Sequence, residues 1–97
     1  MVYQTTMQHA SHKQQLPRLK RARGQVAGII RMVEEEKYCL DILSQIRAAR
    51  AALRKVEQGV METHANHCLR KAVESGRPEE IEKKMSELMG ALERFTR

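Results

Sequence analysis

The chain has 97 residues, of which 41% are hydrophobic, but it holds only two Tyr, one Phe and no Trp. A chain this short buries a modest fraction of its surface, so it relies on partner subunits or other added constraints for stability. No segment has the apolar run of a membrane span or a secretory signal, and two cysteines are too few for a disulfide scaffold. These features favour one small domain that oligomerises in a soluble, reducing compartment, the cytoplasm.

The net charge of +6 is concentrated in the first third of the chain. Residues 1–33 hold six basic residues and no acidic residue, and the remainder holds 12 of each. Such an asymmetry indicates a polyanionic partner, with nucleic acid first and a membrane surface second. The alternative is a solvated helix face that only keeps the protein soluble.

The first predicted helix runs from about Leu16 to Glu36. Its apolar residues recur at spacings near 3.6, and Pro17 suits a first helical turn because that position needs no N–H donor. The polar residues before it predict a mobile segment, 1–15, that precedes a single folded domain, 16–97.

The second predicted helix starts near Tyr38, extends beyond Cys68 and ends before Ser75-Gly76. Its apolar residues alternate in steps of three and four, the heptad pattern by which helices pack side by side. This seam consists of Cys39, Ile42, Ile46, Ala49, Leu53, Val56 and Val60. Gly59 is a weak position in it, since Gly costs roughly 1 kcal/mol relative to Ala inside a helix.

A third helix follows the break at residues 75–78. Apolar residues from Ile81 to Phe95 continue the helical spacing, and three glutamates crowd the first turn, where the helix dipole favours acids. No stretch has a strand pattern. The predicted fold is therefore all-α, with a long central helix between two shorter ones.

Three soft metal ligands lie along one edge of the central helix. His64 and Cys68 are four residues apart and share a face. Cys39 lies 25 and 29 residues earlier, separations that return to within roughly 20° of the same azimuth. Along a straight helix Cys39 and His64 would be about 38 Å apart, so one chain cannot close a site from all three.

Two antiparallel copies packed along the heptad seam place Cys39 of one opposite His64 and Cys68 of the other, which gives two sites per dimer. Two thiolates and one imidazole suit Cu(I). His9, His12 or His67 could add the nitrogen that zinc or nickel prefers, although His67 is expected to be exposed. The alternatives are an ordinary buried Cys39 and a surface or capping His64.

No helix-turn-helix, zinc-finger or basic-zipper signature is present, and the low aromatic content argues against stacking on single strands. A basic face on the first helix remains, extended by basic residues of the second, and its affinity would come mainly from phosphates. The candidates are Arg18, Lys20, Arg21 and Arg23, with Arg50, Arg54 and Lys55 on the central helix.

From about Leu16 to Phe95 the sequence resembles the CsoR-type copper-sensing repressors, whose relatives sense nickel or cobalt, formaldehyde, or persulfide. The resemblance rests on Arg18-Leu19-Lys20-Arg21, Gly24-Gln25-x-x-Gly28, Arg31-Met32, Tyr38-Cys39-x-Asp41-Ile42-Leu43-x-Gln45-Ile46, His64-x-x-His67-Cys68 and Ser86-Glu87-Leu88.

The resemblance implies three-helix protomers that form antiparallel dimers and a dimer-of-dimers tetramer. It implies a repressor of copper-efflux genes that releases operator DNA when Cu(I) binds Cys39, His64 and Cys68. It further implies that Tyr38 and Glu87 link the metal-binding histidine to the DNA-binding state. Arg18 and Lys55 match positions involved in operator binding.

Three other functions stay open: nickel or cobalt sensing, persulfide sensing through Cys39 and Cys68, and cytosolic copper buffering without DNA. Polarised charge argues against buffering, and a persulfide sensor would not need His64. The sequence has no nucleophile–base pair, phosphate-binding glycine loop or open catalytic metal site, so we expect no enzyme.

Overall fold

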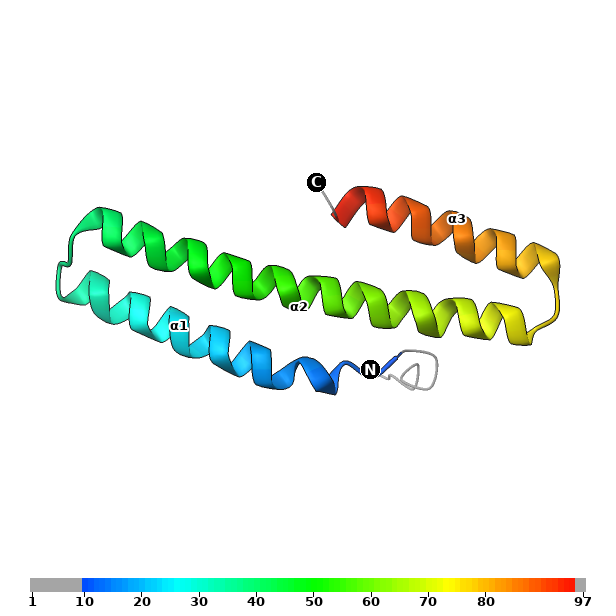
Figure 1. Ribbon diagram of the computed structural model, residues 1–97, viewed down its shortest axis with the longest axis horizontal. Coiled ribbons are helices and arrows are strands. Elements are labelled where there is room, and N and C mark those ends of the chain that lie inside the picture. Colours follow the sequence, from blue (N-terminus) through cyan, green and yellow to red (C-terminus); the bar gives the residue numbers. More distant parts are fainter. Residues whose placement is uncertain (1–9, 96–97) are drawn as a thin grey trace, which may run out of the picture. The chain divides into compact units, whose positions relative to one another are not determined.

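The computed structural model describes residues 10–95, which form three α-helices and one short 3-10 turn (Figure 1). The order is η2 (Lys13–Gln15), α1 (Leu16–Glu34), α2 (Cys39–Glu74) and α3 (Pro78–Phe95). No strand occurs in this described range. The predicted all-α fold with a long central helix is thus confirmed. None of the helices between residues 10 and 95 is both long and apolar enough to cross a membrane.

Helix α1 ends two residues before the predicted boundary because the backbone turns at Glu36. This residue has a φ of 55°, a left-handed conformation that is uncommon for a residue with a side chain. The Lys37 amide donates to the Met32 carbonyl at 2.9 Å, and the Glu36 amide donates to the Val33 carbonyl at 3.1 Å. These bonds satisfy carbonyls that would otherwise lack partners at the helix end.

The break between α2 and α3 lies where the sequence predicts it. Gly76 adopts a φ of 68°, which glycine reaches without steric cost. The Ser75 hydroxyl donates to the Ala72 carbonyl at 2.6 Å and accepts from the Arg77 amide at 3.2 Å. Pro78 then begins α3 as its first residue.

The chain divides into two compact units, each of which contains part of α2. Residues 12–60 form a helical hairpin, in which α1 runs antiparallel to the first half of α2 (Figure 1). Ala22, Ala49 and Val56 are buried in this chain, together with the side chain of Gln15. Gln15 is thus part of the folded unit, although the predicted mobile segment extends to it; residues 1–9 lie outside the described range.

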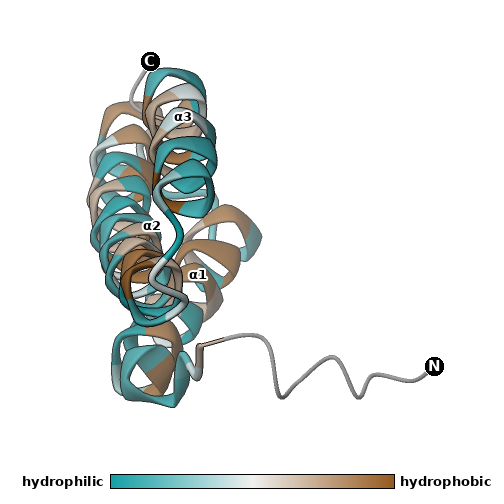
Figure 2. Cartoon of the chain, turned by 90° about the vertical axis from the view of Figure 1, so that its right-hand side faces the viewer, coloured by the Kyte–Doolittle hydropathy of each residue, from teal (hydrophilic) through white to brown (hydrophobic). Residues whose placement is uncertain are grey.

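The second unit holds α3 and the later part of α2, from Met61 onward. Its buried residues are Cys68, Ala72 and Leu88. Because few large side chains are buried in either unit, the chain leaves many large apolar residues exposed. Figure 2 shows apolar residues as brown bands along the helices. This exposure agrees with the expectation that the chain depends on partner subunits.

Gly59 has a packing role that its helix propensity does not reveal. A Cβ at this position would lie 2.8 Å from Cδ and 3.0 Å from Oε1 of Gln15. The absent side chain therefore lets the buried Gln15 amide rest on the α2 backbone. Because Gln15 is only 6% exposed, it has little room to move aside.

We expect Gly59→Ala to lower the free energy of unfolding by about 1 kcal/mol, because overpacking exceeds the gain in helix propensity. Urea denaturation at a fixed protein concentration measures this change. Gly90→Ala is the matched control: a Cβ on Gly90 meets nothing within 4 Å, so this variant should gain stability. Stabilisation by both substitutions would show that the Gln15–Gly59 packing carries no energetic weight.

Candidate metal centre and nucleic-acid interface

The three predicted metal ligands lie on α2, which continues without a break from Cys39 to Glu74. Cys39 is the first residue of the helix and is exposed, as is His64, whereas Cys68 is buried. Both cysteines are free thiols. The donors are thus two free thiols and one imidazole, a set that suits a soft, low-coordinate metal ion.

A single chain does not gather these ligands into a site. Among the described residues, no group of three His, Cys, Asp or Glu side chains is placed to hold a metal ion. This agrees with the helix geometry, which separates Cys39 from His64 by about seven turns. The site shared between subunits therefore stays a prediction, and it needs a second copy of the chain.

The surface that carries the ligands overlaps the predicted heptad seam only in part. Ala49 and Val56 of that seam are buried within one chain, as is the predicted ligand Cys68, so each of the three leaves little surface for a second copy. Cys39, His64 and Cys68 fall within roughly 40° of each other around α2. The same stripe contains the exposed residues Leu43, Ile46 and Leu53. The spacing of these three residues, three and then seven, could be seen in the sequence. It did not identify the exposed stripe, because Ala49 and Val56 fit the same heptad pattern.

The additional histidines give a mixed result. His67 was expected to be exposed, and this is wrong: it is half-buried, and its Nε2 atom is buried without a hydrogen-bond partner among the described residues. His12 is also half-buried, with an unpartnered Nδ1. His9 lies outside the described residues.

Tyr38 and Glu87 are exposed, and neither forms a hydrogen bond to His64 within the described part of one chain. The Tyr38 carbonyl accepts from the amides of Asp41 at 3.0 Å and Ile42 at 3.2 Å, at the start of α2. The Glu87 carboxylate lies 3.5 Å from the ammonium of Lys84 on the same helix. Their predicted link to the metal-binding histidine remains a prediction.

The basic residues of α1 do not share one face. Arg18, Lys20, Arg21 and Arg23 are all exposed. At about 100° per residue, Arg18 and Arg21 form one pair and Lys20 and Arg23 another, on nearly opposite sides of the helix. The predicted single basic face of α1 is therefore two separate pairs.

Arg18 is the member of these pairs that is linked to α2 through Gln15. Its guanidinium Nη1 donates to Gln15 Oε1 at 3.3 Å, and Gln15 rests on Gly59 of α2. Arg18 lies three residues after Gln15, and Val56 lies three residues before Gly59. Because the two helices are antiparallel, Arg18 is at the level of Val56 and its neighbour Lys55. The hairpin thus places two of the predicted DNA-binding residues, one on each helix, at the same level.

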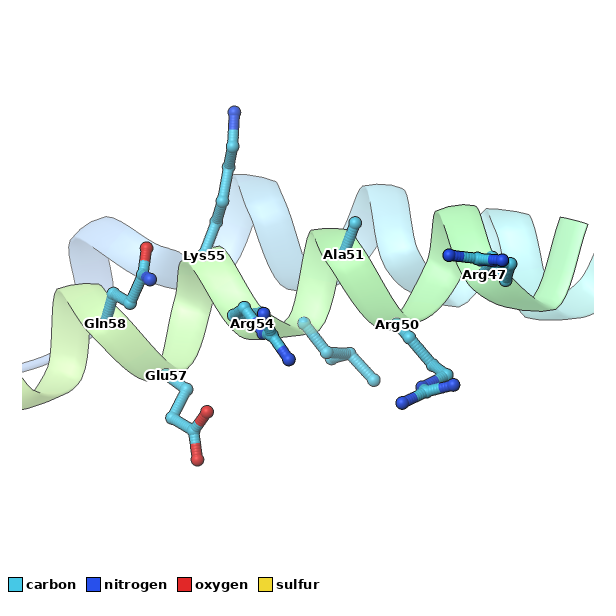
Figure 3. A pocket seen from close by; sticks show the side chains of 8 residues that line it. Arg47, Arg50, Ala51, Arg54, Lys55, Glu57 and Gln58 are labelled. Carbon is cyan, nitrogen blue, oxygen red and sulfur yellow. The ribbon is translucent and has the colours of Figure 1, made fainter. Parts of the chain in front are cut away.

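Arg54 and Lys55 line one groove on α2 but project in different directions (Figure 3). Figure 3 shows Lys55 projecting to one side of α2, while Arg50, Arg54 and Glu57 project from another. These three line a groove that is completed by Arg47, Ala51, Leu53, Lys55 and Gln58. The charged side chains of the groove are all basic apart from Glu57.

Comparisons with known proteins identify the family. Residues 11–94 match the family described as metal-sensitive transcriptional repressors. The chain is 43% identical over 95 residues to the copper-sensing transcriptional repressor CsoR of Bacillus subtilis, covering 95% of this chain and 91% of that protein. It is 45% identical over 80 residues to the copper-sensing transcriptional repressor RicR of Mycobacterium tuberculosis, covering 82% of each chain.

Two solved structures share the fold. The copper-sensing repressor CsoR with Cu(I) from Geobacillus thermodenitrificans is 41% identical with a TM-score of 0.73, covering 100% of this chain and 95% of that one. The nickel-responsive transcriptional regulator InrS is 34% identical, also with a TM-score of 0.73, covering 90% and 94%. The family consists of transcriptional repressors and not of enzymes. The chain belongs to the metal-sensitive transcriptional repressors, as its sequence motifs predicted.

Proposed function

We propose that this protein is a Cu(I)-responsive repressor that binds operator DNA without metal and releases it when Cu(I) binds. The genes under its control would be those of copper resistance. The single observation that carries the proposal is the donor set: two free thiols and one imidazole on one edge of one helix, in a family of metal-sensitive repressors. Thiolates select Cu(I) over harder ions.

The proposed site joins Cys39 of one subunit to His64 and Cys68 of another, in an antiparallel dimer. Two such dimers would associate into a tetramer, as the resemblance implies. The exposed apolar residues on the ligand-bearing stripe support association through α2, because a monomer in water gains nothing from exposing them. Tyr38 and Glu87 would act on the metal-bound imidazole from outside the ligand set.

The proposed DNA-binding residues are Arg18, Lys20, Arg21, Arg23, Arg54 and Lys55. Arg18 and Lys55 are central, because the α1–α2 hairpin holds them at one level and Gln15 orients the Arg18 guanidinium. Guanidinium and ammonium groups bind phosphates and release counterions, which supplies affinity without reading sequence. Binding to operator DNA places the protein in the cytoplasm.

The test is operator affinity at fixed salt, without oxygen, with and without Cu(I). A genomic DNA fragment selected by the metal-free protein serves as the probe, and fluorescence anisotropy measures the dissociation constant. We expect Cu(I) to weaken binding by roughly 5- to 150-fold, the range of typical allosteric couplings. An unchanged dissociation constant with Cu(I) bound would refute the switch, and weak binding to all DNA fragments would indicate copper buffering.

Nickel is the alternative that a specific observation favours. The nickel-responsive regulator InrS has the same TM-score as the Cu(I)-bound CsoR, and His12 and His67 each carry a buried ring nitrogen without a partner among the described residues. Titrating the metal-free protein with Ni(II) and Cu(I), each against a competing chelator, separates the two. Release of DNA by Ni(II) alone would replace copper with nickel in the proposal.

A further inference from the structure

Arg50 and Glu57 lie two turns apart on α2 and have no ion-pair partner within the part of the chain that the structure describes. Both side chains are exposed and project from the same side of the helix (Figure 3). On this side of α2 the exposed apolar residues Leu43 and Ile46 precede Arg50, Leu53 lies between Arg50 and Glu57, and Arg54 lies at the edge (Figure 3). A charge in an apolar interface is unfavourable unless an opposite charge meets it.

We infer that Arg50 of each subunit forms an ion pair with Glu57 of the partner subunit, and that these two reciprocal pairs set the register of the α2–α2 contact. The inference rests on the proposed function, since it assumes the antiparallel dimer that completes the metal site. It adds a role for two residues that are not ligands and do not contact the metal ion.

Residue spacing along α2 carries the inference. Arg50 lies eleven residues after Cys39, and Glu57 lies eleven residues before Cys68. Eleven residues make about three helical turns, so each charged residue keeps nearly the azimuth of its cysteine. If two residues face each other in an antiparallel pair, the residues reached by an equal number of steps forward on one helix and back on the other also face each other. The register that opposes Cys39 to Cys68 of the partner subunit therefore also opposes Arg50 to Glu57 of the partner subunit. Centring Cys39 between His64 and Cys68 shifts this register by two residues, about 3 Å, a distance that the long Arg50 and Glu57 side chains span.

The same two residues disfavour the competing registers. The apolar stripe alone would tolerate a slip of one heptad, because apolar residues would still meet apolar residues. A slip of seven residues in one direction opposes the Arg50 side chains of the two subunits. A slip in the other direction opposes the two Glu57 side chains. Both arrangements place like charges together in an interface, which raises their free energy.

A charge-swap experiment tests the pair. Arg50→Glu and Glu57→Arg are made separately, and sedimentation measures the dissociation constant of the metal-free dimer in the absence of DNA. In Arg50→Glu both positions are acidic, and in Glu57→Arg both are basic, so each homodimer opposes like charges. We expect each variant alone to dissociate at least about tenfold more readily than the natural protein.

An equimolar mixture of the two variants should reassociate, because every opposed pair in the mixed dimer then has opposite charges. The double variant R50E/E57R should also assemble like the natural protein, which excludes misfolding as the cause of dissociation. Arg47→Glu is the matched control: it makes the same charge change in the same groove, but the same register opposes Arg47 to the uncharged Val60 of the partner subunit. Its dimer should be unchanged.

A mixture that stays dissociated, or an Arg50→Glu variant that dimerises normally, would overturn the inference. Equal weakening by Arg47→Glu would assign the effect to general charge and would also overturn it. The outcome is independent of the metal, because sedimentation is done without it. If the mixture reassociates but the natural protein binds no Cu(I), the inferred register holds and the copper proposal fails. If the natural protein binds Cu(I) but the mixture does not reassociate, the copper proposal holds and the inferred register fails.

Discussion

Cys39→Ala and Cys68→Ala should each abolish tight Cu(I) binding when the variant is studied alone, and mixed dimers of the two should regain it. Each variant lacks one ligand in every site, and one of three ligands contributes about a third of a binding free energy near 10–16 kcal/mol, taking structural zinc sites as a guide. The expected loss of affinity is thus on the order of 1,000-fold. Anaerobic titration against a Cu(I) chelator measures it.

The mixture is informative because of where the ligands come from. In a dimer of one Cys39→Ala chain and one Cys68→Ala chain, one site receives an intact Cys39 and an intact His64 and Cys68. The other site has lost both thiols. Random pairing of equal amounts therefore restores about one quarter of the natural binding capacity. A site built within one chain would regain nothing on mixing.

His64→Ala mixed with Cys68→Ala is the matched control. Both substitutions affect the same half of the site, so every site in the mixed dimer lacks a ligand and no capacity should return. Recovery in this control would contradict the assignment of ligands to the two subunits. Full capacity in either single cysteine variant would remove that cysteine from the ligand set.

Arg18→Gln and Lys55→Gln should each weaken operator binding strongly and reduce its dependence on salt. A lost phosphate contact lowers the slope of log affinity against log salt by about 0.9 for each copy that binds DNA. Charge-assisted hydrogen bonds contribute about 1.5–3 kcal/mol, so a dimer that loses two contacts should bind on the order of 1,000-fold more weakly. Fluorescence anisotropy over a series of salt concentrations gives both quantities.

Arg77→Gln is the control for this prediction because it removes the same charge elsewhere. Arg77 is paired with Glu80 at 3.2 Å in the connection between α2 and α3, and the proposal gives it no contact with DNA. The slope for this variant should match that of the natural protein.

Arg21→Gln should also lose operator affinity, since Arg21 lies on the Arg18 side of α1. Arg23→Gln should lose less affinity. A slope unaffected by both Arg18→Gln and Lys55→Gln would exclude this surface as the DNA contact.

The three helices could be predicted from the sequence by itself, because helix formation and termination depend on local residues. Apolar spacing indicates α1 to α3, and Ser75-Gly76 with Pro78 ends one helix and starts the next. The family could also be predicted from the sequence, since each of its motifs is a short run of neighbouring residues. The ligand set also depends only on spacing along one helix, so Cys39, His64 and Cys68 could be placed on a common edge without coordinates.

Only the tertiary structure decided which faces pack inside the chain. Ala49 and Val56 fit a contact with a second copy as well as they fit one within the chain, because a heptad pattern does not specify its partner; their burial settles this. Gly59 reads as a weak helix residue until Gln15 is seen against it. Arg18 and Lys55 likewise lie at one level only because α1 and α2 form an antiparallel hairpin. Residue periodicity determines the side of its own helix on which a side chain lies. Which other segment packs against that side depends on contacts between residues far apart in the sequence.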